Sequence, residues 1–252
     1  MQLLQNATAF NKWTISIVCV GIVLFVIQAA LYKFRWWKIA VIILTLTYVG
    51  NFAARFVSYL QTEGRWGAER LYGDLILVAP AILLLSVVLK IPWCKIGDAV
   101  VWTWCSVFIA GKIRCLFYGC CYGRIVFENS DFIPMFRFPS QIFEIVSLGV
   151  ITLYLLMLKV KKMATGALFP AFMVLYGISR YIADWFRGNP SEWEPFFFYM
   201  PAGRFFSLLN VVIGFVMLYI LLREKLRRKV SIKEVIHAGV AIMPEDYPRN
   251  EF

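Results

Sequence analysis

A small set of charged residues, placed inside or beside long apolar stretches, has the residue types and spacing to do chemistry. The set is Lys112, Arg114, Glu144, Arg180, Asp184, Arg187 and Arg204. An ionisable side chain in or next to hydrocarbon is costly, so by default it marks a pathway or a site. Because most of these residues are positively charged, the sequence predicts a site for an anion on one side of a membrane.

The segment from Tyr176 to Arg187 carries three of these charges at positions i, i+4 and i+7. Residues with this spacing share one face of a helix, so Arg180, Asp184 and Arg187 would form a ladder about 10 Å long. Asp184 would then orient both arginines. The alternative interpretation is a salt-bridge ladder that only stabilises the end of the helix.

The segment from Gly111 to Gly123 reads GKIRCLFYGCCYG and has glycines at positions 111, 119 and 123. This pattern suits a helix end that passes into a loop whose backbone approaches a ligand or another helix closely. It is not a P-loop, because no Gly-Lys-Ser/Thr sequence is present. Packing of small residues between helices would explain the glycines, but it does not explain Lys112 and Arg114.

A third motif, from Pro139 to Glu144, begins another predicted helix. Pro and Ser are favourable at a helix start, and a carboxylate in the first turns is stabilised by the helix dipole. Gln141 and Glu144 lie one turn apart, so both could face the same basic pocket. The alternative is that this motif only caps the helix.

The six cysteines and the single histidine, His237, do not predict a metal site, because no paired C-x-x-C spacing is present. Cys115, Cys120 and Cys121 fall near the presumed outer face, where a disulfide could form, but their spacing assigns no pairing. We therefore expect no metal and no cofactor.

The elements that position these residues are long apolar helices. With 61% hydrophobic residues, 16% charged residues and a mean hydropathy of +0.71, the chain is too apolar for an ordinary soluble domain. Since about 20 residues span a bilayer, the sequence predicts an all-α, polytopic membrane protein with about seven transmembrane helices. The predicted spans are Trp13–Tyr32, Trp36–Leu60, Leu71–Leu89, Ala99–Phe117, Ile142–Leu158, Gly166–Phe186 and Phe205–Leu222.

The basic residues at the helix ends predict an orientation. Fourteen Lys and Arg residues follow the odd-numbered spans and ten lie at the opposite ends, which favours an outside N-terminus and a cytoplasmic C-terminus. Ten of the fourteen are Lys, whereas nine of the ten are Arg, the residue suited to two-point binding of phosphate. We thus expect a membrane domain over residues 1–222, a basic cytoplasmic tail over residues 223–252, and an anion site on the outer side.

Taken together, these motifs resemble one family, the phosphatidylglycerol:prolipoprotein diacylglyceryl transferases of bacterial inner membranes. The family signature, Gly-Arg-x-Gly-Asn/Cys-Phe with two later glycines, is similar to Gly111–Gly123. Its Pro-Ser-Gln-x-Tyr-Glu motif resembles Pro139–Glu144, and its tyrosine-glycine, arginine, acidic, arginine series resembles Tyr176–Arg187. Its Gly-Gln before the last helix resembles Gly203-Arg204, and the resemblance runs roughly from Leu71 to Leu222.

The resemblance implies a reaction in which a cysteine thiol of a lipoprotein precursor displaces glycerol 1-phosphate from phosphatidylglycerol. The thiol then carries the diacylglyceryl group as a thioether. A basic pocket at the outer leaflet fits this chemistry, because it can bind the phosphate and stabilise the negative charge that grows as the C–O bond breaks. The thiol must also lose its proton, which requires a nearby cation or base.

The sequence departs from the family pattern at several positions. The family has a His-Gly-Gly-Leu stretch with a functional histidine in its third helix, whereas the corresponding segment here reads Leu71-Tyr-Gly-Asp-Leu75. Lys112 replaces the signature arginine, Arg114 replaces a glycine, and Gly-Gln has become Gly-Arg. Positive charge is kept or added, but the expected base is missing, and Asp74 or Tyr72 would have to substitute for it.

The leading interpretation is a membrane-embedded transferase that acts on phosphatidylglycerol or another anionic phospholipid, with a lipoprotein precursor as its second partner and no nucleic acid. The alternatives are a lipid-binding or scaffold paralogue without catalysis and a family member with another acceptor. The hypothesis of a transporter for an anionic solute has less support, because the charges lie on one side of the membrane and do not line both halves of a path. The predicted catalytic residues are Asp74, Lys112, Arg114 and Glu144, and the predicted substrate-binding residues are Tyr118, Gly119, Gly123, Gln141, Arg180, Asp184, Arg187 and Arg204.

Overall fold

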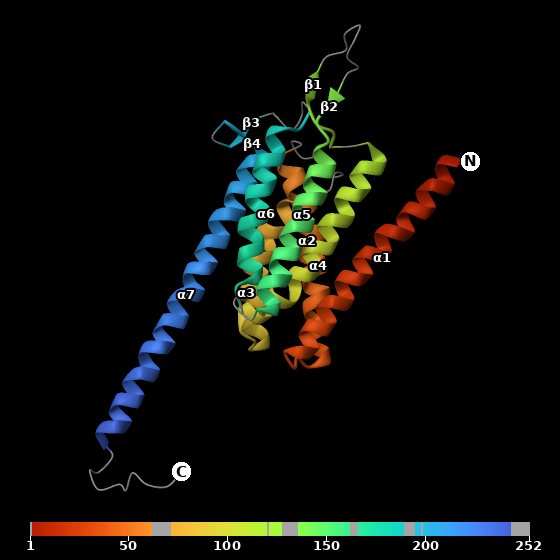
Figure 1. Ribbon diagram of the computed structural model, residues 1–252. Coiled ribbons are helices and arrows are strands. Elements are labelled where there is room, and N and C mark those ends of the chain that lie inside the picture. The colour runs from red at the N-terminus through yellow and green to blue at the C-terminus, as the bar shows by residue number, and fades with distance from the viewer. Residues whose placement is uncertain are drawn as a thin grey trace.

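The computed structural model describes residues 2–61, 72–119, 121–127, 136–161, 166–188, 195–197 and 199–242. Within these residues the chain forms seven α-helices, which confirms the predicted all-α class (Figure 1). The helices are α1 Gln2–Leu31, α2 Trp36–Gln61, α3 Tyr72–Leu89, α4 Trp93–Tyr118, α5 Ser140–Val160, α6 Leu168–Trp185 and α7 Ala202–Ile242. The ends of α1 and α7 that carry the two termini lie at opposite ends of the bundle.

Two short hairpins lie at one end of the helix bundle (Figure 1). Strand β1 (Ile125–Phe127) pairs with β2 (Phe136–Arg137), and β3 (Pro195–Phe197) pairs with β4 (Met200–Pro201), both antiparallel. The first hairpin connects α4 to α5 and the second connects α6 to α7. We call this end of the bundle the hairpin end, and the other the turn end, because short turns join α1 to α2 and α3 to α4 there.

A helix covers most of each predicted span, but several helix ends differ from the prediction. Helix α1 begins well before Trp13, and α7 continues past Leu222 to Ile242, so part of the predicted tail is helical. Four helices contain segments long and apolar enough to cross a membrane: Trp36–Ala53, Trp93–Phe117, Ser140–Val160 and Ala202–Glu224. Helix α6 does not meet this criterion, because Arg180 and Asp184 lower its mean hydropathy.

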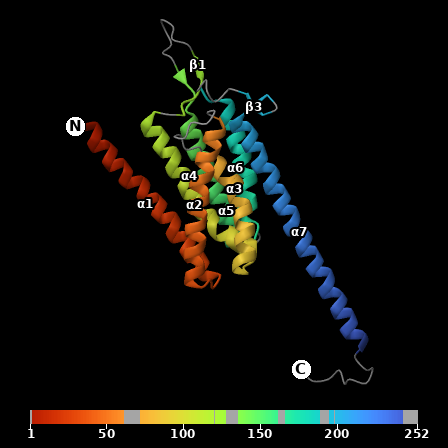
Figure 2. The same cartoon turned by 180° about the vertical axis from the view of Figure 1, so that it is seen from behind.

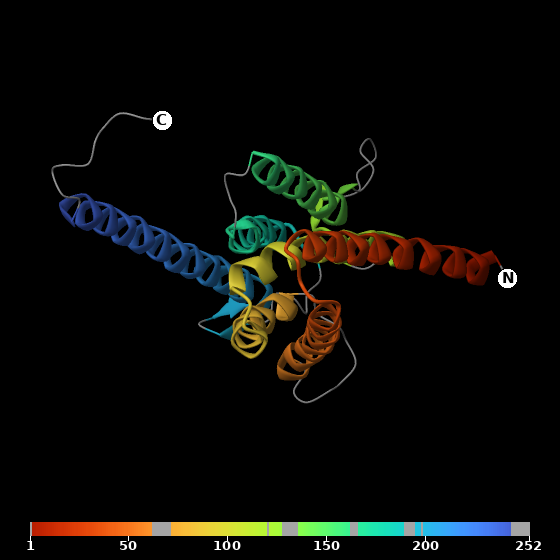
Figure 3. The ribbon, with the colours of Figure 1, turned by 90° about the horizontal axis from the view of Figure 1, so that it is seen from below.

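Helix α4 is at the centre of the bundle. It packs against α1, α3, α5 and α6, while α2 pairs with α3 and α6 pairs with α7. Seen from below, α4 lies among the other helices of the bundle, while α7 and the N-terminal part of α1 reach away from it (Figure 3). The view from behind shows the same divergence of α1 and α7 (Figure 2).

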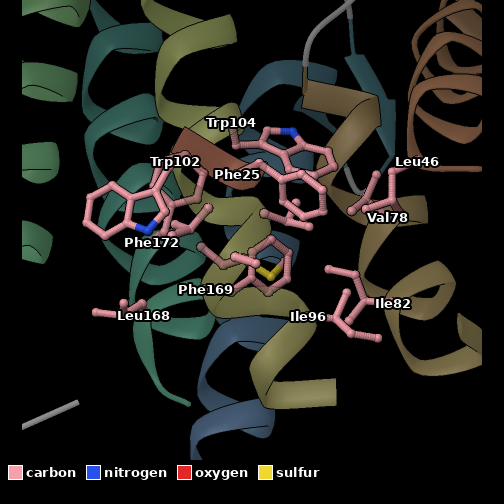
Figure 4. Packing of buried hydrophobic residues seen from close by; sticks show 14 of the residues in the cluster. Phe25, Leu46, Val78, Ile82, Ile96, Trp102, Trp104, Leu168, Phe169 and Phe172 are labelled. Atoms are coloured by element: carbon pink, nitrogen blue, oxygen red, sulfur yellow. The ribbon is translucent and has the colours of Figure 1, made fainter. Parts of the chain in front are cut away.

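The core of the bundle is made of large apolar side chains, mostly from α1 to α6 with Met217 from α7, and Figure 4 shows part of it. Toward the hairpin end, the ring centroid of Phe108 of α4 lies 4.8 Å from that of Tyr176 of α6, and the two rings are tilted by 38°. Phe172 lies parallel to Tyr176 at 5.6 Å, so three rings form one aromatic layer between the two helices. The layer lies one helical turn from Lys112 and Arg180 along α4 and α6.

The outer surface of the bundle is also apolar. Val87 is 75% exposed, Leu153 68% and Leu44 71%, and many other large apolar side chains face outward on every helix. Exposed apolar surface of this extent marks contact with a membrane rather than with water. The length and composition of the helices agree, so the chain is a multi-pass membrane protein.

A buried polar group near the turn end, which the sequence did not predict, joins four helices. Asp98 of α4 is 0% exposed and accepts hydrogen bonds from the backbone N–H groups of Gly166 (2.6 Å) and Leu168 (3.1 Å) at the start of α6. It also accepts one from the Tyr32 hydroxyl after α1 (3.1 Å), to which Lys159 of α5 donates (3.2 Å). Asp98 thereby supplies the start of α6 with the acceptor that its first N–H groups require.

Candidate functional site

Three cationic side chains from two helices and the segment after α6 surround one carboxylate at the hairpin end of the bundle. Oε2 of Glu144 of α5 forms an ion pair with Nζ of Lys112 of α4 at 2.7 Å. Its other oxygen, Oε1, accepts Arg180 Nη1 of α6 at 2.6 Å and Arg187 Nη2 at 3.2 Å. All four side chains are at most 5% exposed. Glu144 is thus the common partner of three cations that the sequence places far apart.

Asp184 adds a second carboxylate to this group. Its Oδ1 lies 3.5 Å from Arg180 Nη2 and 3.6 Å from Arg187 Nε. The geometry agrees with the expectation that Asp184 lies between the two arginines. One detail differs, because α6 ends at Trp185 and Arg187 reaches Asp184 from the segment beyond the helix. We call Lys112, Glu144, Arg180, Asp184 and Arg187 the charged cluster.

The direction of the helices explains why these residues meet. Lys112 and Arg180 lie in the last third of α4 and α6, whereas Glu144 lies near the start of α5. Because α5 follows α4 and precedes α6 in an antiparallel arrangement, its start lies beside their ends (Figure 1). Glu144 is in the second turn of α5 rather than the first, so the three cations, rather than the helix dipole, balance its charge.

The loop after α4 is fastened to Arg187 by backbone contacts. Gly123 forms an isolated antiparallel bridge with Arg187, and the Gly188 N–H donates to the Tyr122 carbonyl at 2.9 Å. A Cβ atom on Gly123 would lie 1.9 Å from the carbonyl oxygen of Phe138, so no larger residue fits there. The close approach expected of this glycine is therefore made to the backbone that leads into α5.

The start of α5 is tied to the same loop. The Ser140 hydroxyl donates to the Cys121 carbonyl at 2.6 Å and does not cap its own helix, whose N-cap residue is Pro139. Gln141, the next residue, is 8% exposed. These contacts hold the first turn of α5, and with it Glu144, against the loop that follows α4.

The start of α7 closes the cluster from a third side. A Cβ atom on Gly203 would lie 2.6 Å from Oδ2 and 2.7 Å from Oδ1 of Asp184, so the backbone of α7 packs directly on this carboxylate. The next residue, Arg204, is 8% exposed, and its guanidinium lies 3.7 Å from the centroid of the Trp185 ring. This stacking is a cation–π contact, which positions Arg204 beside the cluster.

Other predicted site residues lie apart from the charged cluster or cannot be placed. Arg114 has an exposed side chain, because two residues along a helix turn it to the other side of α4 from Lys112. Gly119 adopts the left-handed conformation (φ 64°) that ends α4. The Tyr118 side chain lies outside the described part of the structure. So does the side chain of Asp74, whose backbone belongs to the first turn of α3.

The arrangement favours binding of an anion with two or more oxygens. Three cations oppose two carboxylates, so the charged cluster keeps a net positive charge although its side chains are buried. A buried charge network of this kind persists only when its geometry satisfies most of its hydrogen-bonding groups. Two guanidinium groups and one ammonium group can present several N–H donors to one phosphate.

We expect substitution of Gly203 by alanine to disturb the charged cluster strongly. The added methyl group would displace the Asp184 carboxylate and, through it, the two arginines. A misplacement of this size typically lowers activity by about ten- to hundredfold. The matched control is Gly149→Ala, at a glycine of α5 whose Cβ would meet nothing within 4 Å. Equal phospholipid-dependent activity of the two purified variants would show that the packing of α7 on Asp184 is unimportant.

Comparison with known proteins identifies relatives of the part of the chain that holds the charged cluster. The family model for prolipoprotein diacylglyceryl transferase matches residues 69–220, more than half of the chain. Phosphatidylglycerol–prolipoprotein diacylglyceryl transferase of Clostridium tetani is 29% identical over 113 residues, which cover 41% of this chain and 44% of that protein. The second such transferase of Clostridium perfringens is 27% identical over 172 residues, with coverage of 65% and 66%. The chain therefore matches less than two thirds of the length of each of these relatives.

Proposed function

Because this chain belongs to the prolipoprotein diacylglyceryl transferase family, we propose that it transfers the diacylglyceryl group of phosphatidylglycerol to the cysteine thiol of a lipoprotein precursor. The observation that carries this proposal is the buried charged cluster, in which Lys112, Arg180 and Arg187 meet around Glu144. It lies within the segment that the family model matches, and its chemistry suits a phosphate.

The reaction balances as a displacement at the glyceryl carbon that carries the phosphate ester. The thiolate sulfur forms a C–S bond while the C–O bond to the phosphate breaks, and glycerol 1-phosphate leaves with the electron pair. The thiol proton passes to a base. Negative charge grows on the departing phosphate oxygen, so preorganised cations at that oxygen lower the barrier.

The charged cluster offers distinct roles for its members in this reaction. Lys112, Arg180 and Arg187 would hold the phosphate, while Glu144 and Asp184 keep the cations in place before the lipid arrives. Preorganised charges need little rearrangement during the reaction, which is the main source of their catalytic effect. Arg204, which stacks on Trp185 beside the cluster, would contact the rest of the headgroup, whereas Arg114 faces away from Lys112 and is given no contact with the bound phosphate.

The charged cluster does not supply an obvious base to take the proton of the acceptor thiol. Glu144 and Asp184 are both engaged with cations, and this pairing opposes proton uptake by either carboxylate. The single histidine of the chain, His237, lies far along α7. We assign the base to Asp74, in the first turn of α3, because that segment corresponds to the family's histidine stretch.

The proposal includes an orientation and a location. We place the protein in a bacterial inner membrane with the hairpin end at the outer leaflet, the N-terminus outside and the C-terminus in the cytoplasm. The Lys-rich turn end supports this orientation, since cytoplasmic ends carry an excess of positive charge. A single cysteine placed at Ser231 should react with an impermeant thiol reagent only after lysis, and reaction in intact cells would reverse the orientation.

A direct assay tests the proposed reaction. Purified protein, phosphatidylglycerol and a peptide with a lipoprotein cysteine motif should yield glycerol phosphate and a thioether-linked peptide, both detectable by mass spectrometry. Asp74→Asn should abolish transfer while leaving lipid binding intact, because the amide keeps the shape of the carboxylate but cannot accept a proton. Arg187→Ala should instead weaken lipid binding first.

A second candidate function is binding of an anionic phospholipid without catalysis. The observation that favours it is the pairing of both Glu144 and Asp184 with cations, which opposes proton uptake by either carboxylate. This candidate predicts lipid binding that depends on Arg180 but no release of glycerol phosphate with thiol, amine or hydroxyl acceptors. Transfer to a peptide that lacks its cysteine would instead indicate a family member with another acceptor.

A further inference from the structure

A second concentration of positive charge lies at the turn end, away from the charged cluster. Five cationic side chains line a pocket of about 210 Å³ between the turn that joins α1 to α2 and the turn that joins α3 to α4. They are Lys33, Arg35, Lys38, Lys90 and Lys95. Both turns lie at the bottom of Figure 1, whereas the hairpins lie at the top. This lysine pocket, as we call it, is thus a separate feature from the proposed active site.

The lining of the lysine pocket is cationic, and Asp98 lies behind it, where it accepts from the hydroxyl of the lining residue Tyr32 at 3.1 Å. Among the residues of the described ranges that line it, none is an aspartate or a glutamate. The ion pairs found in the described part of the chain involve other cations. The Lys38 ammonium donates a hydrogen bond to the Leu89 carbonyl at 2.6 Å, and this bond joins the two turns. Five like charges therefore converge with no carboxylate among the described residues that line the pocket, which is unfavourable unless an anion occupies the space between them.

The backbone of the two turns has the same form and presents lysine in the same way. After α1, Lys33 adopts a left-handed conformation (φ 59°), and the Phe34 N–H donates to the Ala29 carbonyl at 3.0 Å. After α3, Lys90 does the same (φ 52°), and the Ile91 N–H donates to the Ser86 carbonyl at 3.1 Å. Each turn ends one helix and begins the next within a few residues.

The starts of α2 and α4 add to the positive potential of the lysine pocket. Arg35 and Lys38 flank the first turn of α2, and Lys95 lies in the first turn of α4. The N-cap residue of α4 is Pro92, which makes no side-chain hydrogen bond to the helix. The Lys95 and Ile96 N–H groups donate to the Pro92 carbonyl at 2.9 and 3.4 Å, and the positive end of the α4 dipole still points toward the lysine pocket.

Tryptophans place the lysine pocket at the depth of phospholipid headgroups. Trp36 and Trp37, which begin α2 beside the pocket, are 81% and 41% exposed. Trp93 begins α4 at the neighbouring position. Trp side chains concentrate at the boundary between hydrocarbon and water, and basic pockets between transmembrane helices at this level bind phospholipid headgroups.

From these observations we propose that the lysine pocket binds the phosphate of an anionic phospholipid of the leaflet opposite the charged cluster. This is a second lipid site, which would hold the two turns together and fix α4 from its start. The bound lipid is not a substrate, because the lysine pocket contains no group suited to activate an acceptor and lies at the far end of the bundle from the charged cluster.

The test uses the purified full-length protein in detergent and counts bound lipids by native mass spectrometry. Dioleoyl phosphatidylglycerol should bind the wild type more tightly than dioleoyl phosphatidylcholine does. The double variant Lys33→Gln/Lys95→Gln should weaken phosphatidylglycerol binding at one of two sites by about 25-fold, at about fivefold for each cation removed. The control is Lys161→Gln/Arg223→Gln, two exposed cations that do not line the lysine pocket.

Two further measurements test the lipid site at the lysine pocket independently of the proposed transferase activity. The Lys33→Gln/Lys95→Gln variant should release glycerol phosphate at the wild-type rate, whereas Arg180→Lys should lose release and keep the lipid at the lysine pocket. Unchanged lipid binding in the lysine variant would overturn the proposal. Excess inorganic phosphate should compete poorly, and binding of inorganic phosphate in place of the lipid would overturn the lipid assignment and give the pocket to a soluble anion.

Discussion

Replacement of Glu144 by glutamine should abolish activity and lower the thermal stability of the protein more than any other single change in the charged cluster. Glutamine keeps the shape of the side chain but removes the charge that Lys112, Arg180 and Arg187 share. Removal of one partner from a buried ion pair typically costs about 3–5 kcal/mol, because the remaining charges stay buried without compensation. The midpoint of thermal unfolding in detergent, together with glycerol phosphate release, measures both effects.

Two companion variants show whether the effect arises from charge. Glu224→Gln removes a carboxylate from an exposed position on α7 and should change neither quantity. Glu144→Gln/Lys112→Met removes one negative and one positive charge, so it should recover stability relative to Glu144→Gln without recovering activity. Wild-type stability of Glu144→Gln would contradict the role of this carboxylate as the common partner of the three cations.

Replacement of Arg180 by lysine should lower activity by about 10²- to 10³-fold, as loss of one preorganised donor often does. Arg180 uses two different nitrogens, Nη1 to Glu144 at 2.6 Å and Nη2 to Asp184 at 3.5 Å. A lysine keeps the charge but offers a single nitrogen, so it cannot bridge both carboxylates and face a phosphate in two-point geometry. Stability should fall less than in Glu144→Gln, since no charge is lost.

Arg223→Lys is the matched control for this prediction, because Arg223 is exposed on α7 and the substitution has the same chemistry. The two variants are compared by their rates of glycerol phosphate release at saturating phosphatidylglycerol, with equal amounts of protein. If Arg180→Lys and Arg187→Lys both keep full activity, the charged cluster is better explained as a salt-bridge ladder that stabilises the ends of the helices.

The helices could be predicted from the sequence because their signal is local. A continuous apolar stretch of sufficient length requires a helix in a membrane, where every backbone N–H and C=O must be satisfied within the chain. Helix ends were predicted less well, as α1 and α7 show, since charge and hydropathy do not mark where a helix stops in water. The spacing of Arg180 and Asp184 along one helix was likewise readable from the sequence.

Contacts between elements far apart in the sequence could not be predicted as well from the sequence. The sequence placed Glu144 near a basic pocket but did not show that one carboxylate joins Lys112, Arg180 and Arg187. Asp98 was missed altogether, although an aspartate that begins a long apolar segment is a signal of a buried acceptor. The opposite exposure of Arg114 and Lys112 follows from helix geometry but requires knowledge of which face of α4 is buried.

The sequence by itself determined that this chain is a helical membrane protein with several cations in or beside its spans, because hydropathy and helical spacing are properties of each segment alone. Its motifs also indicated the family. Only the tertiary structure decided which charges meet and which face away, because antiparallel packing of α4, α5 and α6 sets distances between residues dozens of positions apart. The lysine pocket has the same origin, since two separate turns carry its charges and only their packing brings them together.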